Sequence, residues 1–391
     1  MSLRAPAKPS VLLTNIWLGG RSGTVVVTRD FTLGLARRGW RVAIYSPQAA
    51  SADEELAGAA TVVSNLDDLT WSPDLIHAHQ HPTLTPVMML FPETPIIQFR
   101  HDATAWHDES QRFERIRLHV AVDEACREAI VADTGHSASQ TPILPNAVDL
   151  GRCMRRPALP RSPGKVLIVA NRRGEHAPII RSACEAAGLE VSVVGYGVGR
   201  PSMNLEAEMA SADIVVGAAR IALEAMAIGC VALVCDVRGF AGLATTKTFD
   251  VWRAWNFGFR LLQSPVTPQG VAEALAGYDA DDAAAVCDRV RSEASLEPAL
   301  DRLETLYRSV LDQTFPPVDA KRQASDMAAY LARWLPMEVE RSPFAADLHS
   351  WRGQALSAQA RLDGLVQELG RRGMTVTFET GGQRPDGQNG G

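Results

Sequence analysis

The stretch VLLTNIWLGGRSGTVVVTRDFTLGLARRGWRVAIY, residues 11–45, decides the expected fold. An apolar run at 11–14 predicts a buried strand and is followed by a glycine-rich turn. Apolar residues at helical spacing then predict a helix over 24–38, which Gly39 ends. The apolar run at 41–45 predicts the next strand. A strand, a helix and a strand in this order predict a parallel βαβ unit.

The same alternation of strands and helices continues beyond this unit, is interrupted once, and restarts. The interruption is the proline- and arginine-rich stretch 150–164, which we interpret as an interdomain linker. We therefore expect an α/β protein with two Rossmann-like, doubly wound parallel sheets. The remaining predicted strands lie at 61–63, 75–77, 95–99, 120–122, 165–170, 190–194, 213–216 and 231–235.

A chain of 391 residues is too long for one ordinary core, so several domains are expected. We predict a first domain over 1–155, a second over 156–316, a helical region over 317–375 and a disordered tail over 376–391. A helix over 322–335 is expected to return to the first domain.

Composition and charge exclude several classes of protein. The net charge of −6 argues against a dedicated nucleic-acid binder. The six cysteines form no C-x-x-C pair, which disfavours a zinc site or a disulfide framework and favours reduced thiols in a cytoplasmic protein. No apolar run approaches 18 residues, so no membrane span is predicted.

Two turns that join a strand to a helix carry candidate residues for binding an anionic ligand such as a nucleotide. Gly19 and Gly20 would let an anionic ligand approach the backbone at a helix N-terminus, although a plain tight turn is the alternative. In residues 212–229, Arg220 is placed to face phosphate, and the Glu224 carboxylate could accept both hydrogen bonds of a ribose diol. The alternative for Glu224 is that it only complements the helix dipole.

Three further residues at strand ends are candidates for catalysis. Arg172 and Arg173 follow the first strand of the second domain and would neutralise a leaving diphosphate, unless this turn is only a solvated basic loop. His101 follows the strand 95–99 and would hydrogen-bond a ligand, unless Asp102 merely holds it in a loop.

No metal site is predicted. His77, His79 and His81 alternate on a strand, but no carboxylate or thiol nearby completes a ligand set, so we expect them at a strand end that points into a cleft. The D-x-D string that begins at Asp279 lies in an acidic surface stretch.

Together these segments resemble the retaining GT-B glycosyltransferases, especially family 4, over residues 10–310. The sequence LEAMAIG at 223–229 is the most specific match, and the family's glycine loop and histidine landmarks are similar to Gly19-Gly20, His77-x-His79 and His101-Asp102. The resemblance implies two domains that face each other across a cleft, with Glu224 on the donor ribose and His101 beside the donor sugar. Val216 departs from the family, which carries a second glutamate at this position.

The resemblance further implies transfer of a hexose-type sugar from a nucleotide-diphosphate sugar to a glycan, lipid-linked or protein acceptor, with retention and without a metal or a cofactor. Arg100, Trp106 and His107 would contribute to the acceptor site. The expected location is cytoplasmic, including the inner face of the membrane, and peripheral membrane contact or oligomerisation through helices such as 348–372 stays open. A nucleotide-sugar epimerase and a non-catalytic module that binds a nucleotide sugar or a protein partner are the alternatives.

Overall fold

The computed structural model of the chain forms two compact units, Met1–Asp319 and Ala320–Gly391. The expected tail at 376–391 falls outside the described part, and the expected helix at 348–372 falls within it only in pieces, which are helical apart from the turn at residue 372. The structure describes residues 9–20, 22–49, 54–202, 204–341, 357–358, 360–369 and 371–372.

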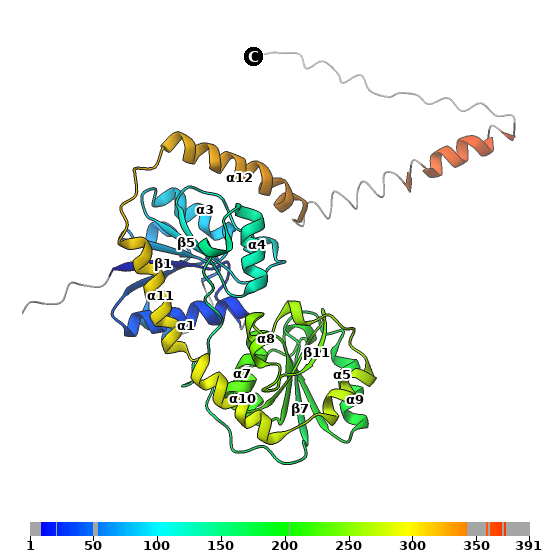
Figure 1. Ribbon diagram of the computed structural model, residues 1–391. Helices are drawn as coiled ribbons and strands as arrows, with labels where there is room; N and C mark the ends of the chain where they lie inside the picture. Colours follow the sequence, from blue (N-terminus) through cyan, green and yellow to red (C-terminus); the bar gives the residue numbers. More distant parts are fainter. Residues whose placement is uncertain are drawn as a thin grey trace, which may run out of the picture. The chain divides into compact units, whose positions relative to one another are not determined.

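The first unit contains two separate sheets, each flanked by helices (Figure 1). The first sheet has six parallel strands in the order β3-β2-β1-β4-β5-β6. Its helices are α1 (Gly23–Arg37), α2 (Glu54–Ala59), α3 (His81–Leu90) and α4 (Glu124–Thr134). Its strands are β1 (Ser10–Thr14), β2 (Arg41–Tyr45), β3 (Thr61–Val63), β4 (Leu75–Ala78), β5 (Ile96–Arg100) and β6 (Ile116–Ala121).

The second sheet has five strands in the order β11-β10-β9-β7-β8, and only β11 runs antiparallel to its neighbour. Its helices include α5 (Ala177–Ala186), α6 (Leu205–Ala210), α7 (Arg220–Ile228), α8 (Phe249–Ala254), α9 (Pro268–Ala276) and α10 (Ala280–Glu293). Its strands are β7 (Lys165–Val169), β8 (Glu190–Val194), β9 (Ile214–Gly217), β10 (Val231–Asp236) and β11 (Gly239–Leu243).

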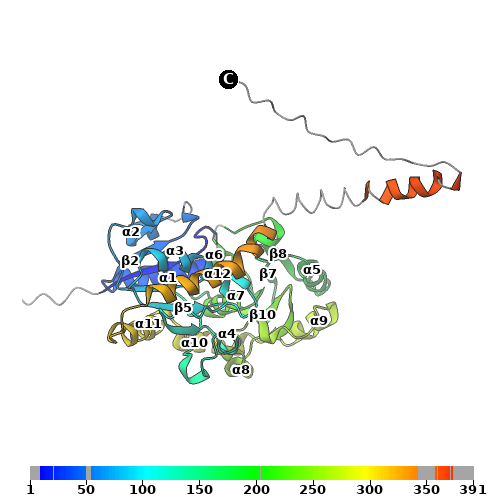
Figure 2. The ribbon, with the colours of Figure 1, turned by 90° about the horizontal axis from the view of Figure 1, so that it is seen from above.

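Both faces of the second sheet are covered, as expected for parallel strands with helical crossovers. Successive side chains of a strand point to opposite faces, so Leu167 and Val169 join a core with α7 and α10. Val166 and Ile168 join a core on the other face with α5 and α9. Helices α5 and α9 contact each other and lie on the right-hand side of both views (Figures 1 and 2). The predicted pair of doubly wound α/β domains is confirmed.

Helix α11 (Leu296–Leu311) connects the end of the second domain to the core of the first. Its buried residues, among them Leu300, Leu303 and Tyr307, pack in one cluster with β1 and α1 side chains. Helix α11 thus makes the return to the first domain, and the helix expected at 322–335 lies within α12. In the second unit, α12 (Ala320–Arg341) is a single 22-residue helix. None of the helices in the described residues combines the length and apolarity that crossing a membrane requires.

Candidate functional site

A cavity of about 610 Å³ lies where the carboxyl ends of the two sheets meet. This volume is in the range of small-molecule sites, roughly 300–1,000 Å³. Ligands of open parallel sheets bind outside the carboxyl ends of the strands, where the strand order reverses. That reversal falls between β1 and β4 in one sheet and between β7 and β9 in the other. Six of the predicted site residues line the cavity: Gly19, His101, Arg172, Arg173, Arg220 and Glu224.

The turn after β1 borders the cavity, and the seventh predicted residue, Gly20, belongs to it. Gly20 has φ +77°, a left-handed conformation that favours glycine, and a Cβ there would overlap the Tyr196 hydroxyl. The Ser22 side chain caps α1 by accepting from the Val25 amide at 3.4 Å, and it also accepts from the Trp17 indole at 3.2 Å. At Gly20, this turn therefore lies close to the Tyr196 side chain of the second domain.

A chain of histidines, buried at His77 and His79 and half-buried at His101, leads from α11 to the cavity. Tyr307 Oη lies 2.6 Å from His77 Nδ1, the His77 and His79 rings are 4.5 Å apart, and His79 Nδ1 lies 2.7 Å from His101 Nε2. Burial lowers the pKa of His77 and His79 well below the usual range, and burial together with the charge of Arg220 lowers the pKa of His101 to about 4. All three rings are therefore neutral near pH 7.

The third member of the alternating histidines has a different setting. His81 begins α3 rather than continuing β4, and its Nε2 lies 3.0 Å from the Trp106 carbonyl oxygen. Within the described residues, no group of three or more His, Cys, Asp or Glu side chains is placed to hold a metal ion. Asp279, from the D-x-D string, caps α10 by accepting from the Asp281 and Asp282 amides.

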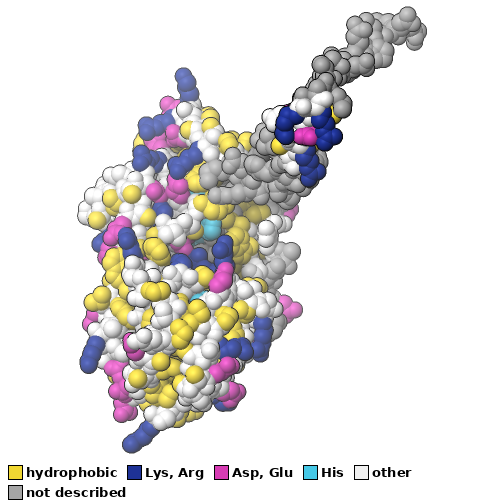
Figure 3. Space-filling model, turned by 90° about the vertical axis from the view of Figure 1, so that its right-hand side faces the viewer, with side chains coloured by type: hydrophobic (Ala, Val, Ile, Leu, Met, Phe, Trp, Pro, Cys, Tyr) yellow, Lys and Arg dark blue, Asp and Glu magenta, His cyan; other side chains and the backbone are white. Residues whose placement is uncertain are grey.

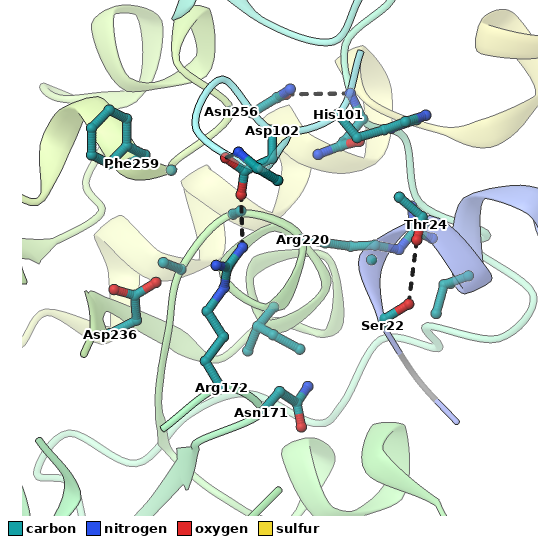
Figure 4. Close-up of a pocket in the computed structure, with 18 of the residues that line it drawn as sticks. Ser22, Thr24, His101, Asp102, Asn171, Arg172, Arg220, Asp236, Asn256 and Phe259 are labelled. Atoms are coloured by element: carbon teal, nitrogen blue, oxygen red, sulfur yellow. Dashed lines mark hydrogen bonds and ion pairs between the residues drawn. The ribbon is translucent and has the colours of Figure 1, made fainter. Parts of the chain in front are cut away.

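Asp102 bridges the two domains at the cavity. Its Oδ2 accepts from Arg172 at 2.7 Å, as the dashed line in Figure 4 shows, and its Oδ1 accepts from Thr104 N and Oγ1 at 2.8 and 2.7 Å. Burial alone would raise the pKa of Asp102, but the Thr104 hydrogen bonds and the Arg172 charge lower it to about 2. Arg172 is thus paired with a carboxylate across the cavity.

Arg220 and Glu224 belong to a buried ion network. Arg220 Nε donates to Glu224 Oε1 at 3.0 Å, Nη1 donates to the Ala147 carbonyl at 3.1 Å, and Nη2 pairs with Asp30 of α1. Arg152 Nη2 lies 3.4 Å from the Asp30 carboxylate and 3.3 Å from that of Glu224. The predicted phosphate ligand Arg220 therefore reaches the cavity, but its guanidinium is bonded within the protein.

Sequence reasoning missed Asp30 and Arg152. The available signal was the position of Asp30 in the predicted helix, where it is surrounded by apolar residues. Asp30 is only 2% exposed. A carboxylate on such a face needs a cationic partner, because burying an unpaired charge is costly.

A strained contact between two loops also went unpredicted. Ala219, just before α7, has φ +53°, and Asn256 and Phe257 have φ +48° and +52°, all unusual for residues other than glycine. The Ala219 amide donates to the Phe257 carbonyl at 2.7 Å. Asn256 links both domains, since its Nδ2 donates to the Val122 carbonyl and its Oδ1 accepts from the Asn146 amide at 3.2 Å. Such strain is frequent at ligand sites.

Asp108 adds a buried carboxyl group to the first-domain side of the cavity. It is 2% exposed, and its Oδ1 has no hydrogen-bond partner among the described residues. Burial and the negative charge of Asp102 raise the pKa of Asp108 to about 7.

Of the expected acceptor-side residues, only His107 lines the cavity, while Arg100 pairs with Asp133. Histidine and basic side chains lie next to one another near the middle of the face drawn in Figure 3.

Comparison with known proteins identifies the fold. A glycosyltransferase from Rickettsia africae ESF-5 is similar with a TM-score of 0.56 and 10% identity, and the match covers 78% of this chain and 100% of that one. A sucrose-phosphate synthase from Thermosynechococcus elongatus gives a TM-score of 0.52 and 15% identity over 78% and 100% of the two chains. No family model matches the chain, and no curated protein matches it in sequence. The chain therefore has the GT-B fold.

Proposed function

We propose that this chain is a glycosyltransferase that moves a hexose-type sugar from a nucleotide-diphosphate sugar to a glycan, lipid-linked or protein acceptor. The observation that carries the proposal is one cavity at the carboxyl ends of both sheets, which Arg172, Arg173 and Glu224 all line. A donor with a diphosphate and a ribose presents the matching groups, namely anionic oxygens and a pair of hydroxyl donors.

Glu224 can contact a ribose while keeping its ion pairs. The hydrogen bonds from Arg220 and Arg152 both go to Oε1. A carboxylate has two oxygens with about four acceptor positions in total, so Oε2 is suited to the ribose hydroxyls. The nucleotide would then lie on the second domain, and the acceptor would lie on the first.

In this reaction, the bond between the anomeric carbon and the diphosphate oxygen breaks, and its electron pair stays on the diphosphate. The acceptor hydroxyl oxygen forms the new bond to the anomeric carbon and gives its proton to the departing diphosphate oxygen. Arg172 and Arg173 would stabilise the negative charge that develops on the leaving group, which a metal ion would otherwise do. The neutral His101 ring can hydrogen-bond a sugar hydroxyl without adding charge beside the anomeric carbon.

Retention of configuration, a metal-independent reaction and the lack of any cofactor besides the donor belong to the same proposal. Val216 lies in β9 with no exposed surface, within the core shared with α5. Val216 does not line the cavity, so this position supplies no carboxylate equivalent to the second glutamate of family 4. The six free, buried cysteines support a reducing compartment such as the cytoplasm.

The test begins with the full chain and a panel of UDP-glucose, UDP-galactose, GDP-mannose and ADP-glucose. A donor that binds the native state raises the melting temperature. Turnover with mixed acceptors should release the nucleoside diphosphate, and Arg172→Gln should lower kcat/KM about 100-fold, as for other preorganised charge-stabilising groups. Arg181→Gln is the matched control, because Arg181 is exposed on α5 and does not line the cavity.

Two results would count against the proposal. Absence of nucleoside diphosphate release, with or without a melting shift, would favour a non-catalytic module. Conversion of the donor sugar without any acceptor would favour an epimerase.

A further inference from the structure

His176 is a buried histidine at the cavity with unused hydrogen-bonding capacity. It lines the cavity, is 4% exposed, and has no hydrogen-bond partner for Nδ1 or Nε2 among the described residues. The other buried histidines of the described chain each bond through at least one ring nitrogen: His77, His79, His81 and His119. Buried polar groups are rarely left unpaired, so His176 is suited to a ligand in the cavity.

The surroundings of His176 favour an anionic ligand. It directly precedes α5, a ten-residue helix whose N-terminus carries partial positive charge. Arg172 and Arg173, in the turn that leads to it, line the same cavity. The charged groups that act on its ring are Asp236, at the end of β10, and its neighbour Glu175.

We propose that His176 contacts the diphosphate of the bound donor and that its ring takes up a proton when the donor binds. This inference rests on the proposed function. A neutral imidazole offers one N–H, whereas an imidazolium offers two, so phosphate favours the protonated ring. The proton comes from solvent and stays on the ring while the diphosphate is bound.

The empty site has the opposite preference. Burial lowers the pKa of His176, and the negative charges of Asp236 and Glu175 only partly offset this effect. The ring is therefore neutral in the empty protein near pH 7, and a bound diphosphate raises its pKa. When a ligand raises the pKa of a group, its affinity increases as the pH falls through the interval between the free and bound values.

The experiment is calorimetry of the full chain with UDP-glucose, GDP-mannose and ADP-glucose. Both phosphates of these probes are esterified, so the probes do not change charge between pH 6 and pH 8. A single titrating group changes the affinity by at most about tenfold per pH unit. We therefore expect about tenfold tighter binding at pH 6 than at pH 8. At pH 7, the observed binding enthalpy should differ between two buffers of different ionisation enthalpy, because the buffer supplies the proton that the protein takes up.

Two variants and one control isolate His176 from Asp108, which also titrates in this range and lines the cavity. His176→Gln should bind more weakly at pH 6 and show much less proton uptake. His176→Lys supplies a permanent charge and should bind with little pH dependence. His136→Gln, outside the cavity, should keep the wild-type profile.

The results separate this inference from the function on which it rests. A wild-type protein that binds and turns over a donor without proton uptake would overturn the role of His176 and leave the glycosyltransferase intact. The same holds if His176→Gln keeps the wild-type affinity and proton uptake. If no probe binds and no donor is turned over, both proposals are overturned.

Discussion

The Asp102 carboxylate accepts a hydrogen bond from the Arg172 guanidinium at 2.7 Å, which connects the end of β5 in one domain to the end of β7 in the other. The Arg238 guanidinium lies 3.9 Å from the same carboxylate. In the proposed reaction, the donor diphosphate needs Arg172, so the diphosphate and Asp102 compete for one cation.

Asp102→Asn should therefore strengthen the binding of a nucleoside diphosphate. Arg172 is more than half exposed, so its pair with Asp102 contributes at most about 1 kcal/mol, and the gain should be up to about fivefold. Calorimetry with a nucleoside diphosphate at low salt measures this gain in affinity. The control is Asp288→Asn, which removes the exposed partner of Arg155 outside the cavity. Weaker binding by Asp102→Asn would mean that Asp102 positions Arg172 for the donor rather than competing with it.

Asp30→Asn should destabilise the folded protein strongly. The change leaves Arg220, which is only 7% exposed, with one carboxylate partner fewer. Removing one partner of a buried ion pair costs about 3–5 kcal/mol. Denaturant unfolding should show this loss, whereas Asp301→Asn, from an exposed pair with Arg38, should cost less than about 1 kcal/mol. Equal losses in the two variants would show that the buried network adds little stability.

Glu224→Gln should weaken donor binding at least about tenfold, the loss of about 1.4 kcal/mol expected for a charge-assisted hydrogen bond. It should also lower stability, because Glu224 pairs with two arginines. Donor affinity is therefore compared with that of Asp30→Asn, which disturbs the same network from a residue that does not line the cavity. Equal donor affinities in these two variants would contradict a ribose contact by Glu224.

The parallel strands and most helices could be predicted from the sequence because their apolar periodicity is local, whereas the antiparallel β11 was missed. The strand predicted at 41–45 is β2, and the helix at 24–38 differs from α1 by one residue at each end. The same logic brought His101, Arg172 and Glu224 to one cavity, since each follows a strand of a parallel sheet. The ion network around Glu224 could not be predicted, because Asp30, which pairs with Arg220 and Arg152, approaches these two arginines only through the docking of two domains.

Asp108→Asn should change how stability depends on pH. The folded protein raises the pKa of Asp108 from 3.8 to about 7, so the protonated form stabilises the fold. That contribution is complete below about pH 4 and is lost as the pH rises to about 7, with an upper bound of about 4 kcal/mol. Melting curves between pH 4 and pH 8 should show a smaller decline for Asp108→Asn. If the melting temperatures of the wild type and Asp108→Asn declined in parallel, Asp108 would be ionised in the folded protein over this whole pH range.

A hydrogen bond joins the rings of His79 and His101. One of the two facing nitrogens, His79 Nδ1 and His101 Nε2, must carry a proton, because the atoms are 2.7 Å apart and both rings are neutral. The orientation of the His101 ring therefore depends on a residue that does not line the cavity. His79 is thus a positioning residue for the proposed sugar contact.

His79→Leu should lower kcat about tenfold or more while changing the donor KM little, because orientation in the transition state is lost and the nucleotide contacts remain. His79→Asn should recover part of the loss, since its amide can occupy the place of Nδ1 and bond to His101. A merely structural role would affect the melting temperature of both variants without this split between kcat and KM. Equal activities of the leucine and asparagine variants at equal stability would therefore rule out positioning through this hydrogen bond.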